Sequence, residues 1–354
     1  MSHLFSDDDD ASDDVPAGGT PDDLGTRRNR RSRVLPAVAI VTALVVVLAL
    51  VGVVVYAGSI DHSVATNLQQ ADELPPDTPT DPDDAPRPPK SASAPDAVNY
   101  VILGSDSRTA DPGQGRSDVL MVLHLDGDRR GASLISFPRD MYVSIPGHGK
   151  NKINAAYAFG GAPLTVRTLE GLLDVRMDHV AIIDFNGFIA LTDQLGGVTV
   201  DNPYASVSQG YDFPVGKVTV RGAQALAYVR ERHQLPGGDL SRAERQRLVV
   251  QAMLRKVASP DVLLNPAKFS SFVGAAAKQV TVDRDLTPAD LRKTALSVRF
   301  KPDDIGSIQA PISGFGTTST GQSIDKVDTD RLKELKKALQ DDGMEDYTAR
   351  YPNG

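Results

Sequence analysis

The chain has 354 residues, no cysteine, no tryptophan, 38 basic and 46 acidic side chains, and a formal net charge of -8. The length allows one large domain or two ordinary ones. The absence of cysteine excludes disulfides, thiol nucleophiles, thiolate zinc sites and iron–sulfur ligation, and it agrees with an export route on which free thiols are a liability. The acidity is concentrated at the start, because residues 1–97 carry 16 acidic and 7 basic side chains, whereas residues 98–354 are nearly balanced.

The first 33 residues join an acidic stretch to an arginine cluster. Residues 1–26 contain too little apolar surface to offset chain entropy, so residues 1–33 are predicted to be a disordered tail. The cluster that ends it consists of Arg27, Arg28, Arg30, Arg31 and Arg33. Such a run is also typical of nucleic-acid patches and localisation signals, and the segment that follows decides between these interpretations.

Residues 34–57 form an uncharged apolar stretch, long enough as a helix to span a hydrocarbon core of about 30 Å. The arginines before it predict a cytoplasmic N-terminus under the positive-inside rule. The alternative is a signal peptide cleaved after Ala57, but the apolar region of a signal is usually only about 7–15 residues long. The sequence therefore predicts a single-pass protein of the cell membrane whose large C-terminal part is extracytoplasmic.

The remainder divides into a proline-rich linker over 58–97 and one globular domain over 98–345. The proline content predicts an extended spacer. Short apolar, β-branched runs predict buried strands at 98–104, 119–125, 132–137 and 180–185. Capping residues and periodicity predict helices near 154–159, 163–173, 186–195, 223–229, 241–259, 266–279, 288–298 and 329–340. This mixture predicts an α/β fold, a single α/β/α domain with a mixed central sheet.

Charged side chains gather where the first two predicted strands meet. Asp106 and Arg108 follow the first strand, and Arg116 and Asp118 come just before the second. The two carboxylates are hard oxygen ligands of the kind that Mg²⁺ takes together with phosphate oxygens and water. The alternatives are a strand-ending turn for the first pair and structural salt bridges for both.

A third strand end adds Arg139, and Lys152 and Asn154 follow in a run that leads into the next helix. The cations at the three strand ends are arginines, where random surface charge would include lysine. Because a guanidinium binds a planar oxyanion through two hydrogen bonds, this choice indicates recognition of an anion.

The densest group of polar side chains lies over 228–247 and contains Arg230, Arg232, Arg242, Arg245 and Gln246. Arg242, Arg245 and Gln246 are three or four residues apart, which predicts one shared helix face. Cations oppose the helix dipole at an N-terminus, so a bound phosphate or pyrophosphate would explain their position. The alternative is a solvated helix surface, paired with Asp239 and Glu244.

Other chemistries lack their sequence signals. The six histidines show no zinc-hydrolase spacing, and neither a nucleophile elbow nor a phosphate-binding P-loop occurs. An extracytoplasmic domain with a nearly balanced charge argues against nucleic acid as a partner.

At these residues the sequence resembles the LytR-CpsA-Psr family of cell-envelope phosphotransferases, in its actinobacterial type. The motifs are VILGSDSR (101–108), GRSDVLMVL (115–123), SFPRDMYVSIPGHGKNKINAAYAFGG (136–161), DFNGFIALTDQLGGVTVDNP (184–203) and GAQALAYVRERHQLPGGDLSRAERQ (222–246). The resemblance implies that Asp106 and Asp118 hold magnesium. It implies that a pyrophosphate is held by Arg116, Arg139, Arg230, Arg232, Arg242 and Gln246. One local departure is Arg247, where a second glutamine is frequent.

The resemblance also implies a function and a lipid site. The enzyme would transfer a glycopolymer phosphate from a polyprenyl-pyrophosphate carrier to a peptidoglycan sugar hydroxyl, with Mg²⁺ as cofactor. The glycopolymer is a teichoic acid, an arabinogalactan or a capsule, and its choice is expected to depend on loops such as 204–220. A hydrophobic tunnel for the lipid is expected to draw on Phe159, Leu172, Ile182, Phe185 and Phe188. The alternatives are a polyprenyl-pyrophosphate phosphatase and a non-catalytic, regulatory binder of lipid-linked glycans.

Overall fold

A computed structural model describes residues 67–78, 85–105, 117–263 and 265–352. The expected tail and membrane helix, together with Asp106, Arg108 and Arg116, lie outside the described residues. Within the described ranges, no helix is both long and apolar enough to cross a membrane.

A mixed seven-stranded sheet forms the centre of the domain. In spatial order its strands are β1 (Gln69–Ala71), β12 (Val280–Asp283), β7 (His179–Asp184), β2 (Val98–Ser105), β3 (Ser117–Leu125), β4 (Ala132–Ser136) and β13 (Ile305–Gln309). The pairs β1–β12, β7–β2 and β4–β13 are parallel, and the other neighbours are antiparallel. The four predicted strands are confirmed, and as β7, β2, β3 and β4 they are consecutive neighbours in this sheet.

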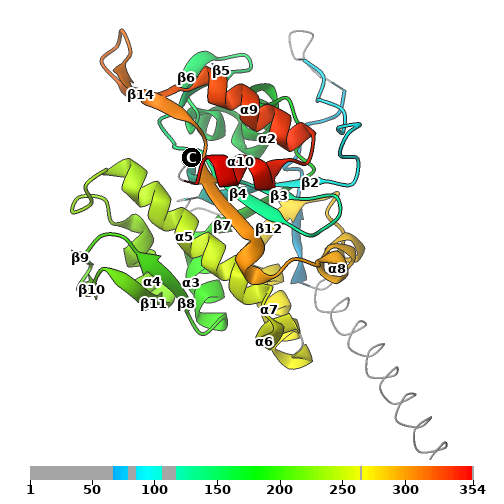
Figure 1. The fold of residues 1–354 in the computed structure, drawn as a ribbon, viewed down its shortest axis with the longest axis vertical. Helices are drawn as coiled ribbons and strands as arrows, with labels where there is room; N and C mark the ends of the chain where they lie inside the picture. Colours follow the sequence, from blue (N-terminus) through cyan, green and yellow to red (C-terminus); the bar gives the residue numbers. More distant parts are fainter. Residues whose placement is uncertain (1–66, 79–84, 106–116, 264, 353–354) are drawn as a thin grey trace, which may run out of the picture. The chain divides into compact units, whose positions relative to one another are not determined.

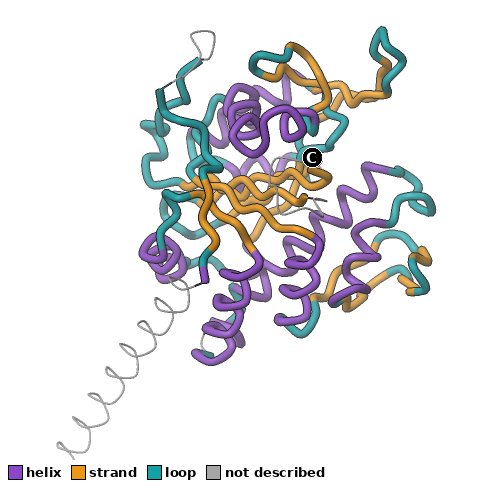
Figure 2. The backbone as a smooth tube through the Cα atoms, turned by 180° about the vertical axis from the view of Figure 1, so that it is seen from behind, coloured by secondary structure: helices purple, strands orange, loops and turns teal. Residues whose placement is uncertain are grey.

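Two helical layers cover the sheet, which gives the α/β/α arrangement that the sequence predicts (Figure 1). On one face α2 (Ala155–Leu173), α9 (Thr329–Gln340) and α10 (Met344–Arg350) bury the larger core with residues such as Val101, Leu103 and Leu169. The other face carries α3 (Phe185–Gln194), α4 (Gly222–Arg230), α5 (Asp239–Val257) and α7 (Pro266–Gln279). Seen from behind, the strands again lie between the two sets of helices (Figure 2). The described residues also form α6 (Pro260–Leu263), α8 (Pro288–Ser297) and the 3₁₀ helix η1 (Pro302–Asp304).

The predicted helices 154–159 and 163–173 correspond to the two arms of α2. Gly160 and Gly161 interrupt the helical backbone between them, and Gly161 has φ +63° and ψ -154°. A side chain is strongly disfavoured in that conformation, so glycine permits the kink. Pro163 then lies in the first turn of the second arm, where its missing N–H costs little.

Four two-stranded ribbons surround the sheet and were not predicted. They are β5 (Tyr142–Ile145) with β6 (Gly149–Lys152), β8 (Val198–Asn202) with β11 (Gly216–Val220), β9 (Ser206–Ser208) with β10 (Tyr211–Phe213), and β14 (Ile312–Thr317) with β15 (Ser323–Val327). The expected loop 204–220 therefore contains three short strands. In the expected spacer, β1 adds an edge strand to the sheet, so part of this proline-rich segment packs on the domain.

Candidate active site

The site forms at the edge of the sheet where β2 and β4 end and β3 begins. Because β3 runs antiparallel to both neighbours, Ser105 pairs with Ser117, and Asp118 lies close to the end of β4. Gly104 permits this approach, since a Cβ there would lie 2.7 Å from the Cβ of Val119. The sheet thus places Asp118 and Arg139, from separate motifs, side by side.

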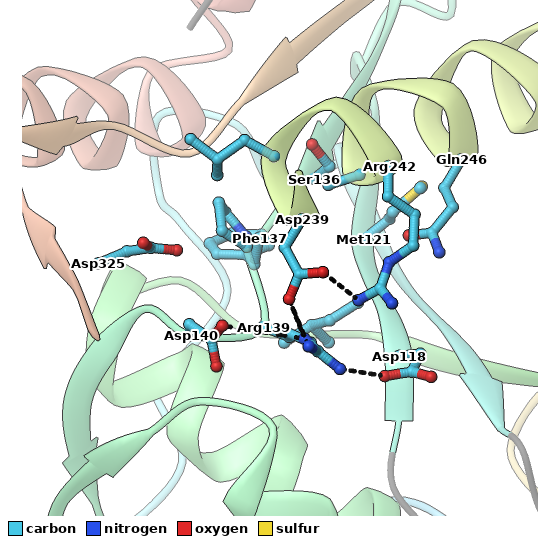
Figure 3. Close-up of a pocket in the computed structure, with 14 residues that line it drawn as sticks. Asp118, Met121, Ser136, Phe137, Arg139, Asp140, Asp239, Arg242, Gln246 and Asp325 are labelled. Carbon is cyan, nitrogen blue, oxygen red and sulfur yellow. Dashed lines mark hydrogen bonds and ion pairs between the residues drawn. The ribbon is translucent and has the colours of Figure 1, made fainter. Parts of the chain in front are cut away.

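Arg139 contacts three carboxylates (Figure 3), of which Asp140 is the most distant, with Oδ2 3.9 Å from Arg139 Nε. Its Nη1 donates to Asp118 Oδ1 at 3.1 Å, its Nε donates to Asp239 Oδ2 at 2.9 Å, and its Nη2 also bonds to Asp239. Asp239 is the first residue of α5 and lies 3.5 Å from Arg242 Nη2 and 3.6 Å from Arg232 Nη1. One carboxylate therefore holds three arginines from three separate segments together.

The positive charge of this group exceeds what Asp239 neutralises. Burial raises the pKa of Asp239, but Arg242, Arg139 and Arg232 outweigh burial and lower it, so the carboxylate stays ionised. Burial and the neighbouring Arg139 lower the pKa of Arg242, as expected where like charges are packed together. An anion with several oxygens would relieve this repulsion.

A cleft of about 410 Å³ opens beside these arginines, between the sheet and helices α3, α4 and α5. This volume lies within the usual range for ligand pockets, about 300–1,000 Å³. Its polar part includes Asp118, Arg139, Arg230, Arg232, Arg242 and Gln246. Its apolar part consists of Ile102, Leu103, Val119, Ile183, Phe185, Phe188, Leu226, Val229 and Val250. Arg230 lies over the Phe185 ring, with Cζ 4.9 Å from the ring centroid, where the two parts meet. A charged head and an apolar tail can therefore occupy one continuous cleft.

Of the five side chains expected to form a lipid tunnel, Phe185 and Phe188 line this cleft. Ile182 of β7 instead belongs to the core on the opposite face of the sheet, because alternate strand residues point to opposite faces. Leu172 lies on α2 and packs against that same core. Phe159 is 48% exposed and stacks on His148. These three side chains therefore do not line this cleft.

A small second cavity adjoins the cleft and shares Asp118, Arg139, Arg242 and Gln246 with it. Asp140, Asp239 and Asp325 also line it, and Lys152 Nζ lies 2.8 Å from Asp140 Oδ1. Burial, reinforced by Asp140, raises the pKa of Asp325 to about 6. Lys152 is thus close to the site through Asp140, without lining either cavity.

Arg245 and Asn154, which were also expected to bind the substrate, line neither cavity. Arg245 is fully buried, and its Nη2 donates to Asn202 Oδ1 at 3.1 Å and to the Tyr204 carbonyl at 2.6 Å. Its Cζ lies 4.4 Å from the Tyr228 ring centroid. Asn154 caps α2 by backbone position and lines neither cavity. Neither side chain takes part in the arginine group.

Two residues of the site were not predicted from the sequence motifs: Asp239, which positions three arginines, and Asp325, whose carboxyl group is buried. Asp239 had a signal, since it lies two residues before the predicted helix 241–259 in a segment rich in arginine, but it was interpreted only as a surface partner. Asp325 had none, because β15 carries no motif and joins β5 only through the fold.

Comparison with known proteins identifies the family. The model of the LytR_cpsA_psr family matches residues 58–341, most of the chain, so this protein belongs to that family. A polyisoprenyl-teichoic acid–peptidoglycan teichoic acid transferase, TagU of Enterococcus faecalis, is 36% identical over 247 residues, which are 68% of this chain and 78% of the relative. TagU of Bacillus subtilis is 33% identical over 250 residues, 69% of this chain and 79% of the relative. The predicted family is confirmed, and these names describe the predicted class of activity.

Solved structures support the same fold. B. subtilis TagV superimposes with a TM-score of 0.61 at 27% identity, covering 70% of this chain and 97% of that one. A structure described as TagT bound to LI-WTA gives a TM-score of 0.56 at 28% identity, covering 72% and 96%.

Proposed function

We propose that this protein transfers a glycopolymer phosphate from a polyprenyl pyrophosphate to a sugar hydroxyl of peptidoglycan. The observation that carries the proposal is the cleft, in which four arginines meet an apolar lining. Pyrophosphate matches the arginines in charge and in its many acceptor oxygens. A polyprenyl chain matches the apolar part. The names of the TagU relatives describe the same donor and acceptor classes.

The reaction needs charge stabilisation and positioning more than a covalent nucleophile. The acceptor oxygen attacks the phosphorus that bears the glycopolymer, and a P–O bond breaks to release polyprenyl phosphate. The hydroxyl proton leaves with a base. Arg139, Arg230, Arg232 and Arg242 would neutralise the pyrophosphate and the charge that develops on the leaving phosphate. Asp239 would hold three of these guanidinium groups in place before the substrate arrives.

The described part of the proposed magnesium site fits that ion. Asp118 offers a hard carboxylate on the cleft, with its side chain about 30% exposed, next to the arginines that would hold the phosphates. We propose that Asp118 and Asp106 hold Mg²⁺, which would neutralise phosphate charge when bound. Titrating Mg²⁺ against transfer would test this. Full transfer after chelation would contradict it.

We also propose that residues 34–57 anchor the enzyme in the cell membrane, with the N-terminus cytoplasmic and the domain outside. An extracytoplasmic position would bring the cleft to peptidoglycan, and an apolar anchor would keep it near a membrane-borne lipid donor. Protease accessibility in intact cells would test the orientation, since cleavage of the domain only after lysis would contradict it.

Arg230→Ala tests the proposed transfer. We expect transfer by the full-length protein to fall by about 10²–10³-fold, because a charge-stabilising donor is lost. Its melting temperature should hardly change, since Arg230 is exposed. Arg221→Ala is the matched control, because Arg221 lies just before α4, is 65% exposed and pairs with Asp193 outside the cleft. Near-normal transfer by Arg230→Ala would count against the proposal. Equal release of glycopolymer phosphate without peptidoglycan would indicate a phosphatase.

A further inference from the structure

A second polar cluster, formed by His124, Asp126 and Asp342, lies away from the proposed active site. His124 and Asp126 lie at the end of β3 and just beyond it, whereas Asp118 lies at its start. His124 lies six residue steps along the strand from Asp118, which corresponds to about 20 Å. None of the three lines either cavity of the active site, so the proposed transfer does not explain this cluster.

The hydrogen bonds of Asn99 fix the protonation of one histidine nitrogen. Asn99 Nδ2 donates to the Arg176 carbonyl at 2.9 Å, so its Oδ1 must be the atom that faces His124 Nδ1 at 2.8 Å. An amide oxygen can only accept, and Nδ1 therefore carries a hydrogen. In the neutral ring this leaves a lone pair on Nε2.

The lone pair on His124 Nε2 would face the carboxylates of Asp126 and Asp342. His124 Nε2 lies 3.1 Å from Asp342 Oδ1 and 3.7 Å from Asp126 Oδ1, and the histidine side chain is fully buried. A lone pair facing two carboxylate oxygens in a buried setting is repulsive, so a cation must lie among these atoms. It is either a proton, on Nε2 or on one of the two carboxyl groups, or a metal ion.

The geometry favours a metal ion over a proton. A proton on Nε2 or on Asp342 Oδ1 bridges that 3.1 Å pair but leaves Asp126 Oδ1 buried and without a hydrogen-bond partner among the described residues. A proton on Asp126 Oδ1 lies too far from Nε2 for a hydrogen bond, since the two atoms are 3.7 Å apart. The three ligand atoms lie within 4.8 Å of one another. Ligands about 2.0–2.2 Å from a tetrahedral Zn²⁺ are about 3.3 Å apart, close to the two distances from Nε2. A ring N–H bonded to a second polar group is also the usual arrangement of a metal-bound histidine.

We propose that His124, Asp126 and Asp342 form a binding site for a divalent transition-metal ion such as Zn²⁺, with water completing the coordination. The carboxylate side chains are 18% and 23% exposed, which gives the ion a path from solvent. Asp342 follows α9, and its Oδ2 accepts from the Gly127 backbone N–H at 2.9 Å. The ion therefore ties the segment between α9 and α10 to the end of β3, as a structural site.

Zn²⁺ binding to the full-length protein, stripped of metal with a chelator and measured by calorimetry, tests the site. We expect one saturable site that Asp126→Asn weakens at least about 100-fold, since it removes a charged ligand. Zn²⁺ should raise the melting temperature of the wild type but not of Asp126→Asn. Asp126 is preferable to the buried His124 for this test, because its Oδ1 bonds to no described residue and the variant should fold.

Two control variants show whether Zn²⁺ binding depends on the proposed site alone. Asp128→Asn is the matched control, because Asp128 is an exposed aspartate two residues away whose carboxylate pairs with Arg130, and it should bind Zn²⁺ like the wild type. Asp118→Asn should also retain the site, which separates it from the proposed magnesium site. No saturable Zn²⁺ binding, or equal binding by Asp126→Asn, would overturn the proposal. A ¹⁵N spectrum of stripped protein under added Zn²⁺ that still shows His124 protonated on both nitrogens would also overturn it, because the cation would then be a proton.

Discussion

At the scale of single residues, Arg242 and Arg245 show how one helix serves two purposes. Successive residues of an α-helix are about 100° apart, so Arg245 lies about 60° to one side of Arg242 and Gln246 about 40° to the other. Arg242 and Gln246 line the cleft, whereas Arg245 is buried between Tyr228 and the Asn202–Tyr204 segment. Spacings of three and four residues thus predict proximity but not a common target.

Replacing each of these two arginines by alanine tests whether one serves transfer and the other stability. Arg242→Ala should abolish transfer with little loss of stability. Arg245→Ala should lower the free energy of unfolding by about 2–4 kcal/mol, because it removes a buried, hydrogen-bonded side chain and leaves a cavity, while the folded fraction keeps most of its activity. Urea denaturation and transfer assays on both variants check this. The opposite pattern would show that the two assignments should be reversed.

The sequence predicts which arginines gather at the cleft better than it predicts the carboxylate that positions them. Arginine in place of lysine at strand ends identified Arg139, and the dense 228–247 segment identified Arg230, Arg232 and Arg242. The role of Asp239 was not predictable from spacing, because Arg139 is 100 residues away in the chain and meets it only across the fold. Arg245 was misassigned because the direction of a helix face depends on what packs around it.

At the scale of elements, β15 and the loop before β5 bring Asp325 and Asp140 to the small cavity. Asp325 lies on β15 and its backbone N–H donates to the Asp140 carbonyl at 2.9 Å, so two carboxyl groups approach each other. Burial and Asp140 raise the pKa of Asp325 from 3.8 to about 6. The folded state therefore binds this proton more tightly than the unfolded chain does.

Asp325→Asn should consequently stabilise the protein at neutral pH. The ionised carboxyl has no destabilising effect below about pH 4, gains it as the pH rises to about 6, and retains it above. We expect a gain of about 1–2 kcal/mol in unfolding free energy at pH 7.5, after allowing for partial hydration, and no gain at pH 4. Denaturation of wild type and variant at both pH values tests this. An equal gain at both would mean that ionisation of Asp325 is not the cause.

The four strands that were predicted are more deeply buried than the two-stranded ribbons that were not. The strands β2, β3, β4 and β7 have apolar runs because helices cover both faces of the sheet, and such runs are visible in a sequence. The ribbons are short and partly exposed. In β14, half-buried and exposed positions alternate and none is fully buried. Ser313, Gly314 and Gly316 therefore leave little hydrophobic pattern to detect.

At the scale of the whole molecule, the proline-rich segment before residue 98 contributes to the folded unit. The Arg87 side chain is only 4% exposed and the Glu170 side chain only 3%. Arg87 Nη2 donates to Glu170 Oε1 at 2.8 Å and to the Met177 carbonyl at 2.6 Å, and Arg87 Nε lies 3.1 Å from both Glu170 oxygens. Composition alone predicts a spacer, because a high proline content gives no indication that a charged side chain such as Arg87 is buried against the domain.

Arg87→Ala should therefore destabilise the domain by about 3–5 kcal/mol, since it leaves the carboxylate of Glu170 buried without its partner. Lys90→Ala is the control, because Lys90 is a half-exposed cation three residues later that pairs with Asp178, and it should cost at most about 1 kcal/mol. Arg87→Met combined with Glu170→Leu should recover much of the loss, because an apolar pair needs no compensating charge. Urea denaturation of the four proteins measures these differences. If Arg87→Ala cost no more than Lys90→Ala, this ion pair would not hold the segment to the domain, and the extended spacer would be the better description of residues 58–97.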